Sequence, residues 1–163
     1  YGNIPAEEIR DKREKAVRKG YEDMLATDPD SKAAKKKAKK ALALQNKYRK
    51  QAGAKTLEWS DEMYEYGLYR LKTSGFDSHK NNKRDCSAYF GDLADIMYVE
   101  KDCHWMSENL AIGNSNPSDA VKDWRESKGH YRTMIEDYWK CGAIVQYDNT
   151  QIAVFSWLRN QHI

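Results

Sequence analysis

The chain has 163 residues, a length that suits one domain of about 100–200 residues with a short accessory segment. Hydrophobic residues make up 40% and charged residues 33% of the sequence, so a folded core is expected under a well-solvated surface. No apolar run approaches the roughly 18 residues needed to cross a bilayer, which excludes a membrane-spanning protein.

The net charge of +3 conceals an uneven distribution. Residues 1–56 hold 16 Lys/Arg against 8 Asp/Glu, whereas residues 57–163 hold 12 against 17. We therefore expect a basic helical extension over residues 1–40 and a folded domain over residues 41–163. The lysine tract of this extension (Lys35, Lys36, Lys37, Lys39 and Lys40) can contact an anionic surface through charge alone, although a solvated helix face is the alternative. Specific nucleic-acid binding is not expected, because no aromatic residues are interleaved with the lysines.

The N-terminal half reads as three helices. Residues 6–25 carry apolar side chains at helical spacing, and a second helix is expected from a cap at Asp30 or Ser31 to about Gln51. A third begins after a cap at Ser60 and ends at Gly75. Gly67, inside this third helix, indicates that another element packs closely against it.

In the C-terminal half, the sequence pattern changes from an aperiodic stretch to a helix and then to two strands. Residues 76–105 lack clear periodicity and are expected to form a long loop with one short helix near "DLADIMY". A further helix begins at Asn116 and Pro117, with Val121 and Trp124 facing inward. Residues 141–147 and 151–157 then form a β-hairpin around a three-residue connection. Both faces of its second strand are apolar: Ile152 and Val154 on one, Ala153, Phe155 and Trp157 on the other. Such a strand requires helices on both sides of the sheet.

Three cysteines leave one thiol unpaired. In an oxidising compartment we expect Cys86 to pair with Cys103, since both lie in the aperiodic stretch where a cross-link stabilises most. Cys141 then stays reduced and buried. Three free thiols in a reducing compartment remain the alternative.

Several motifs in order carry a resemblance to a known family. They are "LALQNKYRKQAGAKTLEWSDEMYEYGLYRL", "SGFDSH", "SENLAIG", "AVKDWRESKGHYRTMI" and "CGAIVQY…IAVFSW". Together they resemble the CAP domain of cysteine-rich secretory, antigen 5 and pathogenesis-related proteins, in its bacterial form. The resemblance implies an α+β fold, an α-β-α sandwich with a small antiparallel sheet between helices.

The resemblance also implies a cleft lined by two histidines and one or two glutamates. By motif these are His79, Glu108 and His130, and Ser127 stands where many eukaryotic members carry a second glutamate. Glu126 is one residue away but points about 100° around a helix. We expect these residues to bind a ligand, and His79, His130 and Glu108 to be able to hold a divalent metal such as zinc. A structural alternative is that Glu108 only ties the sheet to the helices.

Three functions follow as hypotheses. The first is an extracellular or cell-surface binding module whose cleft takes a small molecule, a lipid or a protein. The second is a metal-assisted hydrolase, a peptidase, with Glu108 as its candidate catalytic group. The third places the function in the N-terminal lysines. We favour binding over catalysis, because no serine or cysteine in the sequence has a recognisable activating partner.

Overall fold

The computed structural model describes residues 5–91 and 106–157. The elements follow in the order α1 (Ala6–Ala26), α2 (Lys32–Gln51), β1 (Glu58–Trp59), α3 (Asp61–Ser74), α4 (Asn82–Phe90), β2 (Met106–Ile112), α6 (Pro117–Arg125), α7 (Lys128–Ile135), β3 (Cys141–Tyr147) and β4 (Thr150–Ser156). None of the described helices is long and apolar enough to cross a bilayer.

The four strands form one sheet in the order β1-β3-β4-β2. β3 and β4 pair antiparallel, as do β4 and β2, whereas the two-residue β1 runs parallel to β3. The sheet is therefore mixed, and β2 forms one of its edges. The hairpin connection is two residues long, not three, because Thr150 already pairs with Tyr147.

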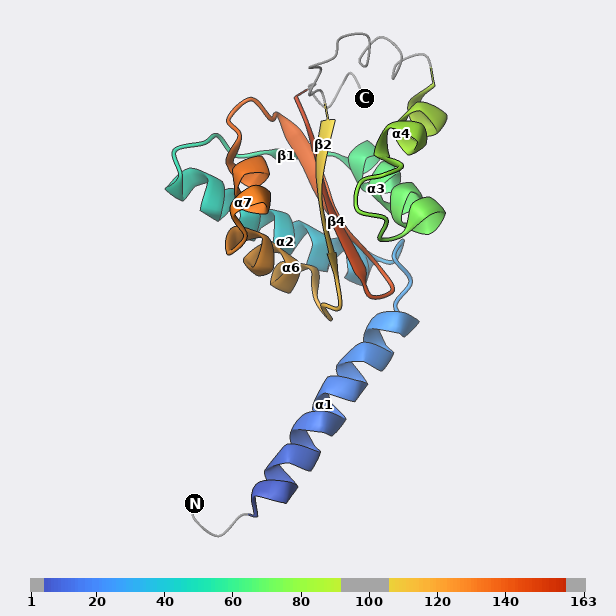
Figure 1. The fold of residues 1–163 in the computed structure, drawn as a ribbon, viewed down its shortest axis with the longest axis vertical. Helices are drawn as coiled ribbons and strands as arrows, with labels where there is room; N and C mark the ends of the chain where they lie inside the picture. The colour runs from blue at the N-terminus through green and yellow to red at the C-terminus, as the bar shows by residue number, and fades with distance from the viewer. Residues whose placement is uncertain (1–4, 92–105, 158–163) are drawn as a thin grey trace.

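Helices cover both faces of the sheet, which confirms the expected sandwich (Figure 1). One layer contains α3 and α4 and packs on the side chains of Ile152 and Val154. The other contains α2, α6 and α7 and packs on Ala153 and Phe155. Trp157 was expected in this second set but is 46% exposed, because β4 ends at Ser156.

The helix boundaries follow local signals. Ser31, Ser60 and Asn116 all cap as expected, each accepting a hydrogen bond from a backbone N–H in the first turn. Gly67 also behaves as expected: a Cβ added there would lie 2.7 Å from Val145 Cγ2. Val121 and Trp124 are buried.

The expected long loop after Phe76 is in part wrong, since residues 82–90 form α4. The short helix expected near "DLADIMY" lies outside the described residues. Cys86 is buried, but its expected partner Cys103 also lies outside them, so that disulfide stays a prediction. Cys141 is buried as expected, and burial raises the pKa of its thiol to about 12.

The N-terminal helix α1 projects from the body like an arm (Figure 1). Its last turns attach it: Met24 is buried, and the Tyr21 hydroxyl donates to the Gly113 carbonyl. The division expected between residues 40 and 41 falls inside α2, whose Ala38 and Ala41 both belong to the core. The lysines therefore lie on a helix that is itself part of the sandwich.

Candidate functional site

Glu108 lies on the edge strand β2 and points toward α3. Alternation along the strand puts it on the same side as Leu110, which packs in the α3 layer. The residue is only 6% exposed. A carboxylate buried to this extent requires positive or hydrogen-bonding partners.

Its principal partner is Arg70 of α3. The guanidinium contacts both carboxylate oxygens, with Nε 3.2 Å from Oε1 and Nη2 3.0 Å from Oε2. Arg70 itself is fully buried. This forked contact fixes the plane of the carboxylate.

Two further carboxylates surround the same guanidinium. Arg70 Nη2 lies 2.7 Å from Asp77 Oδ1, and Nη1 lies 3.3 Å from Asp85 Oδ2. Burial alone would lower the pKa of Arg70, but the hydrogen bonds and charges of Asp77 and Glu108 raise it. Burial likewise opposes ionisation of Asp77, yet Arg70 outweighs it and lowers the pKa of that carboxyl. The four residues form a largely buried ionic cluster, which Arg84 joins from the surface through a 3.3 Å contact with Asp85.

His79 connects this cluster to the surface. Its Nδ1 lies 2.7 Å from Glu108 Oε2, while its side chain is 43% exposed. Since a carboxylate only accepts, Nδ1 is the nitrogen that carries a hydrogen in this contact, and Nε2 is left to face a ligand. Both His79 and Ser78 have left-handed backbones, with φ of 69° and 58°. Such strain persists only where surrounding contacts hold it.

His130 and Ser127 lie in the other helical layer. His130 Nδ1 is 2.9 Å from Ser127 Oγ, and Asn109 of β2 donates to the His130 carbonyl at 3.0 Å. Burial lowers the pKa of His130, and a positive charge on His79 would lower it further. Glu126 is exposed and ends α6.

The predicted residues thus form two pairs on either side of β2. His79 contacts Glu108 directly, and His130 contacts Ser127. Sequence reasoning missed the ionic partners Arg70, Asp77 and Asp85. A signal was present for Arg70, which follows Met63 and Gly67 at helical spacing and so falls on the apolar face of α3.

A zinc ion does not fit these residues as arranged. Both oxygens of Glu108 are bonded to Arg70, whose positive charge opposes a cation at the same carboxylate. Among residues 5–91 and 106–157, no three His, Cys, Asp or Glu side chains are grouped to hold a metal ion.

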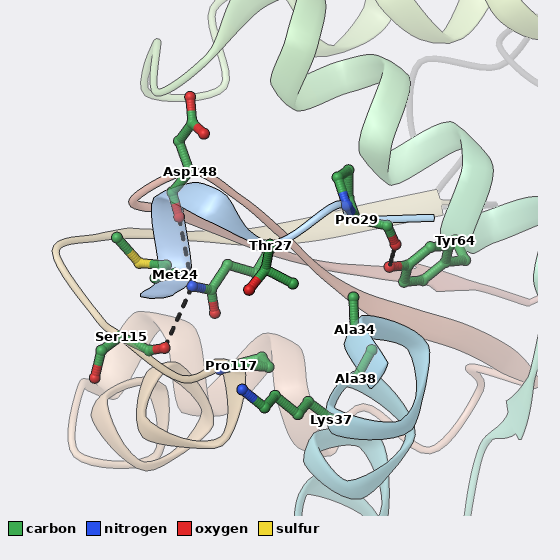
Figure 2. Close-up of a pocket in the computed structure, with 11 residues that line it drawn as sticks. Met24, Thr27, Pro29, Ala34, Lys37, Ala38, Tyr64, Ser115, Pro117 and Asp148 are labelled. Atoms are coloured by element: carbon green, nitrogen blue, oxygen red, sulfur yellow. Dashed lines mark hydrogen bonds between the residues drawn. The ribbon is translucent and has the colours of Figure 1, made fainter. Parts of the chain in front are cut away.

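A small cavity of about 30 Å³ lies elsewhere, where the end of α1 meets the body (Figure 2). Its walls include Met24, Pro29, Tyr64 and Pro117. Space of this size holds about one water molecule. It belongs to the joint that attaches α1.

Comparisons with known proteins support the fold. The family model for the cysteine-rich secretory protein family matches residues 42–156. A search of curated proteins finds no significant relative.

Solved structures share the fold at low identity. An extracellular protein of Bacillus anthracis containing an SCP domain is 16% identical, with a TM-score of 0.59 over 80% of this chain and 45% of that one. A cysteine-rich secretory protein of Staphylococcus aureus is 12% identical, with a TM-score of 0.58 over 76% and 39%. An outer surface protein of Borrelia burgdorferi is 19% identical, with a TM-score of 0.50 over 72% and 90%.

This chain spans less than half the length of the first two proteins, so the likeness concerns one domain of each. The motifs, the sandwich and the family match together cover most of the chain. The protein belongs to the cysteine-rich secretory protein (CAP) family.

Proposed function

We propose that this chain is a secreted or surface-exposed CAP-domain binding module whose ligand contacts His79, Glu108, Ser127 and His130. The location is supported by the fold neighbours, two of which are described as an extracellular protein and an outer surface protein. The family resemblance supports a ligand at the two histidines.

The observation that carries this proposal is the contact between buried Glu108 and half-exposed His79. A buried ionic cluster adds little to the stability of a fold, because the cost of desolvating the charges offsets most of the attraction between them. Here the cluster holds a surface imidazole in one orientation, on a left-handed backbone. A rigid polar group at the surface suits recognition, because little side-chain entropy is lost on binding.

The polar groups define the chemistry of the ligand. Because its pKa is lowered, His130 is neutral near pH 7. His130 therefore offers a neutral ring, His79 offers an imidazole oriented by Glu108, and Ser127 offers a hydroxyl. These groups match a small molecule or lipid with a hydroxyl or carboxyl head group.

Equilibrium dialysis of the full chain with labelled palmitate and cholesterol tests the proposal. We expect at least one of these probes to bind, and the affinity to fall at least tenfold in His79→Ala plus His130→Ala. The neighbouring exposed pair Lys80→Ala plus Lys128→Ala is the matched control and should bind as the wild type does. Binding that survives loss of both histidines would remove this site. Calorimetry with zinc should give no heat that depends on the histidines, and a dependent signal would restore the metal hypothesis.

A hydrolase is the second candidate, and one contact favours it. A carboxylate on Nδ1 orients a histidine so that Nε2 can accept a proton from water, as a general base requires. In this form Glu108 positions His79 and no metal takes part. Hydrolysis of a peptide library should then fall at least 100-fold in Glu108→Gln and in His79→Ala. Equal rates in the wild type and Glu108→Gln would rule the activity out.

A further inference from the structure

Helix α2 carries the most concentrated charge of the molecule. Between Lys32 and Gln51 it holds nine Lys/Arg and no Asp/Glu, whereas α1 holds six of each. The basic character predicted for the whole N-terminal segment therefore resides on one helix. A shallow surface depression on it is lined by Lys32, Lys35, Lys36, Lys39, Lys40 and Ala43. We call these five lysines the lysine ridge.

The ridge occupies one face of α2 because its members recur every three or four residues. Ala38, Ala41 and Leu42 lie on the buried face of the same helix and anchor it in the core. By spacing, the exposed residues Lys47 and Lys50 continue the ridge toward the C-terminal end. The result is a row of cations with about one or two per turn, on a rigid support.

The ridge lacks acidic partners in the described part of the chain. None of the described ion pairs involves an α2 lysine, whereas α1 pairs Lys12 with Glu8 and Lys19 with Asp23. Like charges three or four residues apart repel, and cations near a helix N-terminus oppose its dipole. The ridge thus destabilises its own helix, and an external anion would relieve that repulsion.

Two members of the ridge are held in place by aromatic rings. Lys35 Nζ lies 5.6 Å from the centroid of the Tyr64 ring, and Lys39 Nζ lies 5.4 Å from that of Trp59. Cation–π contacts of this kind restrict the lysine side chains before any ligand arrives. They also cover the rings, so these aromatics are not presented for stacking.

The side chains around the lysine ridge indicate which class of polyanion it can bind. Insertion into a bilayer requires apolar side chains beside the charges, yet none of the large apolar side chains exposed in the described ranges belongs to α2. Single-stranded nucleic acid is bound by exposed aromatic rings among cations, which the ridge lacks. What remains is recognition of a linear backbone by charge alone.

We propose that the lysine ridge of α2 binds a linear polyol-phosphate polymer, in which phosphodiesters join small polyols and carry one negative charge per repeat. The choice of this polymer over duplex DNA rests on the extracellular location proposed above. The ridge shares no residue with the site proposed at His79 and Glu108, so either binding test can fail alone.

The test measures binding of purified poly(glycerol phosphate) to the full chain by fluorescence anisotropy over a salt series. The ridge variant is Lys32→Gln, Lys36→Gln and Lys40→Gln, which spares the lysines on the rings. The matched control is Arg10→Gln, Lys15→Gln and Arg18→Gln on α1, where the cations are equally exposed and the net charge changes equally.

We expect the ridge variant to bind at least tenfold more weakly at low salt. Its plot of log affinity against log salt should be shallower by about 2–3, since three phosphate contacts are lost and each contributes roughly 0.7–0.9 to the slope. The control should stay within twofold of the wild type. Circular dichroism should show no loss of helix in the ridge variant, because neutral glutamine removes repulsion.

Four outcomes would overturn the proposal. They are equal losses in ridge variant and control, an unchanged affinity in the ridge variant, no polymer binding by the wild type, and tighter binding of phosphatidylglycerol vesicles or duplex DNA than of the polymer at equal phosphate concentration. The first would reduce the effect to net charge. The last would assign the ridge to another partner.

Discussion

The two layers of the sandwich each bury an arginine, and they neutralise it differently. Arg70, in the α3 layer, meets three carboxylates. Arg49, in the α2 layer, meets only backbone carbonyls, those of Lys55, Met134 and Glu136. Both residues are fully buried.

The two arginines differ in what their contacts do: those of Arg49 join parts of the fold, and those of Arg70 orient a group of the candidate site. Carbonyl dipoles compensate a cation only in part, so burial lowers the pKa of Arg49 although the charge of Asp137 opposes this. Within the described structure, Arg49 Nη2 has no hydrogen-bond partner. Arg49 joins α2 to the C-terminal end of α7 and the residue after it, whereas Arg70 orders the carboxylate that contacts His79. The ionic cluster lies in the α3 layer, where it fixes the surface imidazole of His79 through Glu108.

The largest effect should come from Arg70→Met. It leaves Glu108 buried without its guanidinium partner and Asp85 with Arg84 alone, and breaking a buried pair in this way costs about 3–5 kcal/mol. Urea unfolding followed by circular dichroism measures the loss. Arg70→Lys should be intermediate, because an ammonium keeps the charge but not the forked contacts. A loss below about 1 kcal/mol for the methionine variant would contradict the cluster.

The same variant should alter the dependence of stability on pH. The pKa of Asp77 is lowered in the folded protein, so its contribution is present above the unfolded pKa of about 3.9 and is lost as pH falls through the folded pKa. The difference in unfolding free energy between the wild type and Arg70→Met should therefore become smaller below about pH 4. A gap of constant size from pH 7 to pH 3 would be inconsistent with this.

Arg49→Met should cost less, about 2–3 kcal/mol, because it removes hydrogen bonds to carbonyls but strands no buried carboxylate. The difference in unfolding free energy between Arg49→Met and the wild type should vary little with pH. Parallel denaturant titrations of the two arginine variants make the comparison. If Arg49→Met proved the more damaging, the proposed difference between the layers would be wrong.

Gly67→Ala probes the packing of the α3 layer. The new Cβ would approach Val145 Cγ2 to 2.7 Å and Ile152 Cγ2 to 3.3 Å. Overpacking of about 1–3 kcal/mol, offset by about 1 kcal/mol of helix propensity, should leave a net loss of up to about 2 kcal/mol. Thermal unfolding measures it, and Val145→Ala should partly rescue the alanine variant if this contact is the cause.

The smallest effect concerns the caps of the opposite layer. Asn116→Ala removes the acceptor for Ser118 N–H and should cost about 1 kcal/mol. Ser127 also sits at a helix N-cap, but its hydroxyl pairs with His130 and caps no backbone group. Ser127→Ala should therefore change the unfolding free energy by less than about 0.5 kcal/mol. Equal losses would show that Ser127 acts as an ordinary cap.

What the sequence alone determined was local or strictly periodic. Caps at Ser31, Ser60 and Asn116 depend on one residue and its own helix, and the two apolar faces of β4 depend on alternation. These features need no knowledge of distant partners. The family motifs added the positions of His79 and Glu108.

Only the tertiary structure determined which side chains contact the carboxylate of Glu108. Helix α4 escaped prediction because its short buried side includes Asp85, a charge that is neutralised there by Arg70 of α3 and by the adjacent Arg84. Arg70 and Glu108 are 38 residues apart. No local pattern specifies such a pairing, since the free energy of a buried charge depends on groups that folding brings together.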